Sequence, residues 1–183
     1  MDLSVDILIN NAGFTIADKF TETDWPRQQN MSVAMMVTIA GLTHAFLPPM
    51  LERKWGRIIN VASNLAWAPG GIGHTQYPAS KAYVLRFSQS LFQETHGSGV
   101  HVTVTCPGST QTDFQKANDI EATSKNMPSF LVQSVEQAVD SAIKANEKGK
   151  SVHVPGWHNK LLVSLLQLAP DQLVMPFVRR ASK

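Results

Sequence analysis

The sequence is short of cysteine and of charge, and each shortage excludes a class of protein. A single cysteine, Cys106, rules out an internal disulfide and fits a reducing cytoplasm. The 16 Lys and Arg residues nearly balance the 14 Asp and Glu residues, which gives a formal net charge of +2. Basic residues cluster only at Arg179, Arg180 and Lys183, without a nucleic-acid motif, so we expect no nucleic-acid partner.

Long apolar runs and metal-binding patterns are also lacking. No uninterrupted apolar run reaches the roughly 18 residues of a membrane-spanning helix. The start, MDLSVDIL, has no basic region and no long apolar core, so we expect no signal peptide. The six histidines show neither HExxH spacing nor pairing with cysteines, which predicts no metal site. The 183 residues, 43% of them hydrophobic, suit one cytoplasmic globular domain.

Strand and helix patterns alternate along residues 1–156. Strands are predicted at residues 5–9, 57–62, 100–105 and 151–155, and helices at residues 25–46, 77–95 and 132–145. This alternation predicts an α/β fold with a doubly wound parallel sheet, which binds ligands beyond the carboxyl ends of its strands. The first helix has an apolar stripe with core spacing, formed by Met31, Met35, Met36, Ile39 and Leu42.

Residues 157–183 form an apolar, leucine-rich tail that contains Pro170 and Pro176. Such a segment could lie on a membrane surface. Few basic residues occur along its apolar stretch, however, so we favour a helical tail that covers a substrate cleft or packs on a partner, without a membrane.

Three side chains suited to carbonyl chemistry occur between Arg57 and Lys81. Ser63 follows a predicted buried strand, and Tyr77 and Lys81 are four residues apart, so they share one face of the next helix. An ammonium beside a phenol favours the phenolate and lowers the tyrosine pKa from its ordinary value of about 10. A hydroxyl, a phenol and a cation at a strand end can polarise a carbonyl and move a proton, which predicts chemistry on a ketone or an alcohol.

Two further turns follow predicted strands. Gly13 ends the run Asn10-Asn11-Ala12-Gly13, where its missing side chain lets a ligand approach the main chain. Pro107-Gly108-Ser109-Thr110-Gln111-Thr112 follows the third strand. With Ser63 and Tyr77-Pro78-Ala79-Ser80-Lys81, these runs resemble the NNAG, catalytic Ser, YxxxK and PGxxxT signatures of the short-chain dehydrogenase/reductase family, in its order. The Val154-Pro155-Gly156 run and its leucine-rich tail resemble the DltE-like branch.

The resemblance implies that residues 1–156 form part of a Rossmann-like domain, from its fourth strand onward. It implies an NAD- or NADP-dependent oxidoreductase that acts on a ketone, an aldehyde or a secondary alcohol, and that forms a homo-oligomer. Tyr77 would be the general acid/base, Lys81 would bond the nicotinamide ribose, and Ser63 would hold the substrate carbonyl. The implied cofactor contacts are Asn10, Ala12, Gly13, Tyr77, Lys81, Pro107, Gly108, Thr110 and Thr112.

The sequence departs from the family pattern at two places. Met35 stands where the family has a catalytic Asn, and Asn30, five residues earlier, faces another side of the helix. The eleven glycines show neither GxxxGxG nor GxGxxG spacing, so the phosphate-binding loop is missing and the choice between NAD and NADP stays open. We therefore expect the strand at residues 5–9 to have an unpaired edge and exposed apolar surface. A fragmentary gene model, a true truncation and a subunit completed by another chain all remain open.

Two other functions compete with this interpretation. A catalytically incomplete fragment that acts as an interaction or dimerisation module would form dimers without binding a cofactor. A Ser–Lys hydrolase would use Ser63 and Lys81, but the nucleophile-elbow pattern GxSxG is absent. The substrate would depend on the loop at residues 113–130, where apolar residues suggest a partly apolar ligand: Phe114, Ile120, Met127 and Phe130.

Overall fold

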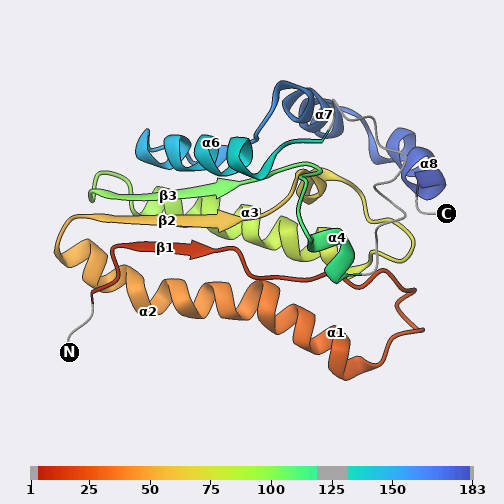
Figure 1. The fold of residues 1–183 in the computed structure, drawn as a ribbon, viewed down its shortest axis with the longest axis horizontal. Coiled ribbons are helices and arrows are strands. Elements are labelled where there is room, and N and C mark those ends of the chain that lie inside the picture. The colour runs from red at the N-terminus through yellow and green to blue at the C-terminus, as the bar shows by residue number, and fades with distance from the viewer. Residues whose placement is uncertain (1–3, 119–131, 182–183) are drawn as a thin grey trace.

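The computed structural model describes residues 4–118 and 132–181, in which four strands form one parallel sheet (Figure 1). The strands are β1 (Ile7–Asn10), β2 (Gly56–Val61), β3 (Val100–Thr105) and β4 (Val152–His153), in the order β1-β2-β3-β4. Sequential parallel strands need crossover connections, and helices supply them here. The predicted parallel α/β fold is therefore confirmed.

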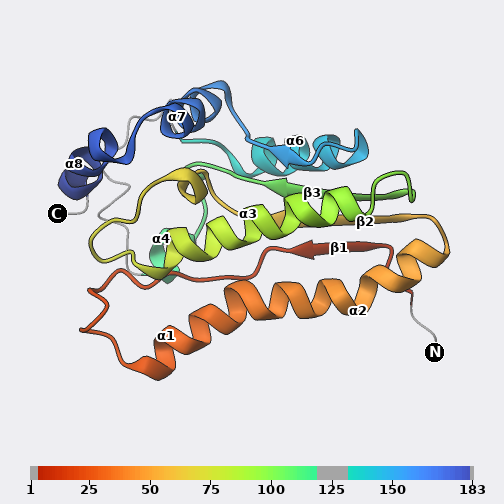
Figure 2. The same ribbon diagram turned by 180° about the vertical axis from the view of Figure 1, so that it is seen from behind.

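Helices cover both faces of the sheet (Figures 1 and 2). The long helical stretch near the N-terminus consists of α1 (Trp25–Ser32), the π-helical turn η1 (Val33–Val37) and α2 (Thr38–Glu52). The other elements are the 3₁₀ turn η2 (Asn64–Trp67), α3 (Gln76–Glu94), α4 (Phe114–Ala117), α6 (Val135–Glu147), α7 (Trp157–Leu168) and α8 (Asp171–Ala181). The helical C-terminal extension is therefore present, and Pro176 lies inside α8.

The core lies between the sheet and the pair formed by α2 and α3. Leu8, Ile58 and Val102, one from each of three adjacent strands, meet Met50 of α2 and Leu91 of α3. Alternate residues of a strand point to opposite faces of the sheet, so the neighbours of Ile58 in β2 and of Val102 in β3 point to the face that α6 covers. This arrangement leaves the carboxyl ends of the strands at one edge of the sheet, beside η2 and α4 (Figure 1).

The edge of the sheet at β1 exposes apolar side chains. In the part of the chain that the structure describes, β1 pairs with β2 alone. Ile7 and Ile9 point away from α2 and are 55% and 54% exposed. The expected unpaired, apolar edge is therefore present.

The first helix differs from its predicted form in two respects. It was expected to end at Phe46, but α2 continues through Pro48 and Pro49 to Glu52. Leu42 was expected in the core and is exposed, because Thr43 takes the inward position and donates a hydrogen bond to the Ile39 carbonyl. Three other residues of the predicted stripe are buried: Met31, Met35 and Ile39.

The continuous stretch Trp25–Glu52 is also long and apolar enough to cross a membrane, with a mean hydropathy of 1.5. Length and composition alone are weak evidence for a membrane span, because core helices pass the same test. Its inward stripe packs against the sheet, while Val33, Val37, Leu42 and Leu51 are exposed.

Candidate active site

The turn that carries Ser63 lies beside the loop that follows β3. Ser63 precedes η2 with an extended backbone, and its hydroxyl accepts a hydrogen bond of 3.2 Å from the Leu65 N–H. The next N–H, that of Asn64, donates to the Pro107 carbonyl at 2.9 Å. Because β2 and β3 are parallel neighbours, their carboxyl ends bring these two turns together.

Tyr77 is the second residue of α3, and its ring lies against aromatic and apolar neighbours. Its ring centroid lies 6.1 Å from that of Phe114 on α4, and Phe14 packs on the same buried cluster. Burial raises the pKa of Tyr77 to about 12, and a side-chain hydrogen bond with Ser63 opposes that rise. The Ser63 and Tyr77 side chains therefore meet.

Lys81 lies one turn further along α3 and is almost fully buried. Its Nζ atom donates a hydrogen bond of 2.8 Å to the Val61 carbonyl, at the end of β2. The same atom lies 5.5 Å from the centroid of the Tyr77 ring. Burial lowers the pKa of Lys81 to about 8, and the nearby Cys106 thiol acts in the opposite direction. The structure thus brings all three predicted catalytic side chains to one place.

The predicted decrease of the tyrosine pKa is wrong for this structure. The pKa of Tyr77 is raised because burial penalises the phenolate, and the hydrogen bond with Ser63 opposes this rise without cancelling it. Burial also weakens the ammonium form of Lys81, the group that was expected to stabilise the phenolate. At neutral pH the tyrosine therefore carries its proton.

The predicted cofactor residues after β1 divide into two groups. Ala12 and Gly13 are exposed at the carboxyl end of the strand, where a ligand can reach the main chain. The Asn10 side chain points into the core instead, where it donates a hydrogen bond of 2.8 Å to Asn60 Oδ1. A Cβ atom on Gly13 would overlap the Met35 sulfur, so the missing side chain also makes room for Met35.

The loop after β3 is shaped by its own hydrogen bonds. The Thr110 hydroxyl donates to the Gly108 carbonyl at 3.2 Å. Thr112 is exposed, and its hydroxyl accepts a hydrogen bond of 3.2 Å from the Phe114 N–H at the start of α4. Pro107 and Gly108 are half-buried beside the Ser63 turn. The predicted contacts Ile120, Met127 and Phe130 lie outside the described residues.

Met35, which we expect at the place of the family's catalytic Asn, has apolar surroundings. Met35 lies in the π-helical turn η1, is 1% exposed and packs with Ile16 and Met31. Asn30 is exposed on α1 and does not join this cluster. π-Helical turns occur often at functional sites, and here the turn carries the Met35 thioether.

Sequence reasoning missed a buried amide cluster behind the Ser63 turn. Asn159 Oδ1 accepts a hydrogen bond of 3.2 Å from Asn64 Nδ2, and Asn159 Nδ2 donates to Gln133 Oε1 at 3.3 Å and to the Pro155 carbonyl at 2.9 Å. A Cβ atom on Gly108 would overlap Asn159. The sequence signal that could have revealed this cluster is Asn159, a lone asparagine near the start of a leucine-rich helix.

The side chains at this site fit the nicotinamide end of a dinucleotide. An ammonium has three N–H donors, and Lys81 gives one of them to the Val61 carbonyl, so it can also bond a ribose hydroxyl. A bound nicotinamide would supply or accept the hydride. No glycine-rich phosphate loop occurs in the sequence, so the fit extends to the nicotinamide end alone.

The fold and the site define a parallel α/β protein whose candidate site lies at the carboxyl ends of the strands, where such sheets bind nucleotides. The family model described as short chain dehydrogenase matches residues 3–122, and the chain belongs to this family.

Relatives and solved structures agree with this assignment. The chain is 33% identical over 165 residues to the ketoacyl reductase HetN of a Nostoc strain, covering 90% of this chain and 55% of the relative. It is 32% identical over 165 residues to the 3-oxoacyl-[acyl-carrier-protein] reductase FabG of Vibrio harveyi, covering 84% and 66%. A short-chain dehydrogenase from Sphingobium yanoikuyae in complex with NADPH is similar in structure, with a TM-score of 0.77 and 28% identity over 92% of this chain and 64% of the other. The chain thus spans little more than half the length of the first relative.

Proposed function

We propose that the chain carries the nicotinamide and substrate end of an NAD(P)-dependent oxidoreductase that acts on a ketone, an aldehyde or a secondary alcohol. The observation that carries the proposal is the meeting of Ser63, Tyr77 and Lys81 at the carboxyl edge of the sheet. The names of the relatives, a ketoacyl reductase and a 3-oxoacyl reductase, support a carbonyl substrate. The NADPH in the similar solved structure supports the class of cofactor.

In this proposal each side chain would have a distinct part in carbonyl reduction. The Ser63 hydroxyl would donate a hydrogen bond to the substrate oxygen and so polarise the carbonyl. Tyr77, which its raised pKa keeps protonated at neutral pH, would deliver a proton to the same oxygen as the carbonyl carbon receives hydride. The Lys81 ammonium would stabilise the phenolate left behind, which solvent reprotonates. Alcohol oxidation would use the same steps in reverse.

Further contacts and properties belong to the same proposal. The main chain at Asn10, Ala12, Gly13, Pro107, Gly108 and Thr110 would contact the cofactor, together with the Thr112 hydroxyl. The Val154-Pro155-Gly156 run and the tail helices support a place in the DltE-like branch, and the single buried cysteine supports a cytoplasmic location.

Self-association would use the outer side of the first long helix and α3. Val33 and Val37 are exposed there. A shallow depression on α3 adds further apolar surface, lined by Ala79, Ala82, Tyr83, Arg86, Phe87 and Ser90. Both features support a homo-oligomer.

The test combines cofactor binding with turnover. The purified chain is titrated with NADH and with NADPH by fluorescence, and NAD(P)H oxidation is followed with a panel of ketones that includes a 3-oxoacyl thioester. We expect weak cofactor affinity, because the sequence has no glycine-rich loop at a helix N-terminus to bind the pyrophosphate. Turnover that is unchanged by Tyr77→Phe would refute the proposal. A dimer that binds neither cofactor would favour the interaction module.

A further inference from the structure

One side of α7 is an apolar stripe that faces solvent. Trp157, Leu161, Leu165 and Leu168 recur every three or four residues, which places them on one face of the helix. Their side chains are 72%, 54%, 57% and 83% exposed. The face of α7 that packs on the protein is a different one, which carries the buried residues Asn159 and Val163. The leucine stripe is therefore not part of the core.

The apolar surface continues onto α8. Leu173 and Phe177 are four residues apart on α8 and are 64% and 70% exposed. The two helices follow each other at one end of the molecule, above and beyond the η2 turn (Figure 1). Single exposed leucines are ordinary, but an apolar surface of six large side chains on two consecutive helices is typical of an interaction site.

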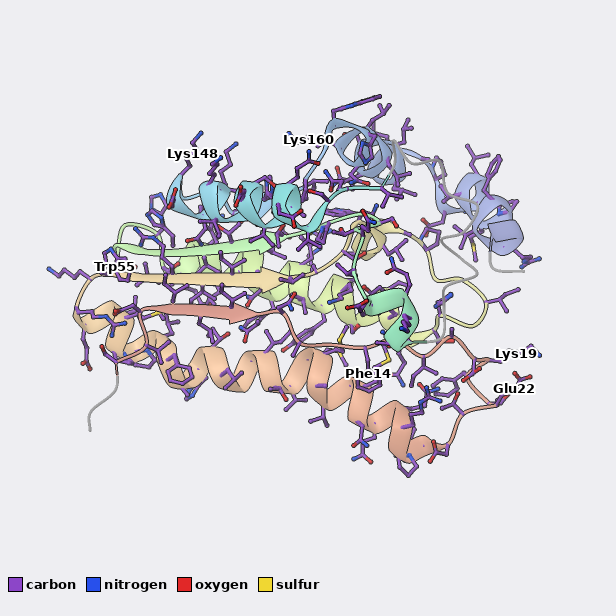
Figure 3. All side chains as sticks on the ribbon, viewed as in Figure 1. Phe14, Lys19, Glu22, Trp55, Lys148 and Lys160 are labelled. Atoms are coloured by element: carbon purple, nitrogen blue, oxygen red, sulfur yellow. The ribbon has the colours of Figure 1, made fainter. Side chains whose placement is uncertain are left out.

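The C-terminal part of the chain also concentrates positive charge. Residues 148–183 hold six of the 16 Lys and Arg residues but one of the 14 Asp and Glu residues, a formal charge of +5 against −3 for residues 1–147. The six are Lys148, Lys150, Lys160, Arg179, Arg180 and Lys183. In Figure 3, Lys148 and Lys160 extend from the same side of the molecule, where α6 and α7 lie. Lys160 is exposed on α7, next to the stripe.

We propose that α7 and α8 dock the protein on the surface of an anionic phospholipid bilayer, with the stripe Trp157, Leu161, Leu165 and Leu168 inserted among the headgroups. Helices that lie in a bilayer interface combine an apolar face with Lys and Arg at its borders, and Trp suits the boundary between headgroups and acyl chains. Anionic headgroups complement the exposed basic side chains of these two helices, Lys160 on α7 and Arg179 on α8. This inference is independent of the proposed chemistry.

A second copy of the chain fits this surface less well. In a two-fold symmetric dimer each patch meets its own copy, so the two positive segments would face each other across the contact. The other expected role of the tail, as a cover for the substrate cleft, would not use this apolar side. In the structure that side faces solvent, and α7 contacts η2 through its Asn159 side.

The test is vesicle binding of the 183-residue chain. Vesicles of phosphatidylcholine with about 30% phosphatidylserine are compared with pure phosphatidylcholine vesicles by co-sedimentation, at low and at high salt. We expect binding to the anionic vesicles, a blue shift of tryptophan fluorescence, and weakening of both by salt. Trp157→Phe should remove the blue shift, because Trp157 lies on the stripe.

The decisive variant is the triple substitution Leu161→Ser, Leu165→Ser and Leu168→Ser. It should weaken vesicle binding roughly tenfold or more, because most of the inserted apolar area is lost. The matched control, Leu42→Ser with Leu51→Ser, changes exposed leucines on α2 and should leave binding unchanged. Absence of binding to anionic vesicles, or equal binding of the triple variant, would overturn the proposal. The proposal would also fail if the chain bound no vesicles and analytical ultracentrifugation showed a dimer that the triple substitution abolishes, because the stripe would then bind a second copy of the chain.

Discussion

The Lys81 ammonium lies 5.5 Å from the centre of the Tyr77 ring and is held there by a 2.8 Å hydrogen bond to the Val61 carbonyl. Burial acts on both groups, raising the pKa of the Tyr77 phenol to about 12 and lowering that of the Lys81 ammonium to about 8. At neutral pH the pair therefore consists of a neutral phenol and an ammonium. This is the protonation state from which a carbonyl oxygen can receive a proton.

Tyr77→Phe tests the proton donor. We expect ketone reduction to fall by about 100-fold or more, because general acid catalysis contributes about 10² to 10⁴ in rate. The free energy of unfolding should change by no more than about 1.5 kcal/mol, since the ring keeps its contact with Phe114 and one hydrogen bond with Ser63 is lost. Steady-state kinetics and urea denaturation measure the two quantities.

The control is the second of the two tyrosines in the sequence. Tyr83 stacks on Phe87 with ring centroids 5.9 Å apart, on the outer side of α3, so Tyr83→Phe should leave turnover unchanged. The Tyr83→Phe protein has Tyr77 as its one phenol, and its absorbance titration should have a midpoint near pH 12. A midpoint near 10 would mean that Tyr77 is more hydrated than the structure shows.

Lys81→Met tests the buried ammonium. The ordinary lysine pKa of 10.5 falls to about 8 in the folded chain, so the unfolded chain binds more protons between pH 8 and pH 10.5. The stability of the wild-type protein should therefore rise between about pH 8 and pH 9, and this rise should be absent in Lys81→Met. Above pH 9 the Cys106 thiol, whose pKa burial raises to about 12, offsets the gain. At pH 7 the variant should be more stable by on the order of 2 kcal/mol and should lose turnover. Denaturation at several pH values measures this, with the exposed Lys144→Met as the control.

The sequence predicted the elements that bring the candidate site together, because strand periodicity and turn residues are local signals. Ser63 and Pro107 each follow a strand, and parallel strands place such turns at one edge of a sheet. The unpaired edge of the sheet at β1 was also predicted from the order of the strands. These features depend on the order of the elements and hardly on the details of packing.

Features that depend on distant contacts were missed. The raised pKa of Tyr77 arises from burial, to which Phe114, 37 positions away, contributes. Asn159 bonds Asn64 across 95 positions. The first long helix continues past Pro48 and Pro49, where local propensity favours an end, because Met50 is fully buried in the core. Packing energy outweighs the local preference there.

Gly13→Ala tests the contact between Gly13 and Met35. A Cβ atom on Gly13 would overlap the Met35 sulfur, so the substitution should cost roughly 1 to 3 kcal/mol of stability. Met35→Ala leaves a cavity and is destabilising by itself. In the Met35→Ala background, however, Gly13→Ala should cost less, by about 1 kcal/mol or more. Denaturation of the wild type, the two single variants and the double variant measures this coupling. Strictly additive effects on the free energy of unfolding would show that Met35 does not restrict residue 13.

Asn159→Ala tests the amide cluster behind the Ser63 turn. The substitution leaves the Asn64 amide and the Gln133 and Pro155 carbonyl oxygens without their buried partner, so it should lower the free energy of unfolding by about 1 to 3 kcal/mol. Because Asn64 follows Ser63 directly, turnover should fall further than the loss of folded protein explains. Asn30→Ala, at an exposed position on α1, should change neither quantity. Thermal unfolding and kinetics on the folded fraction measure both, and an Asn159→Ala protein as stable as the wild type would show that these hydrogen bonds do not hold the turn.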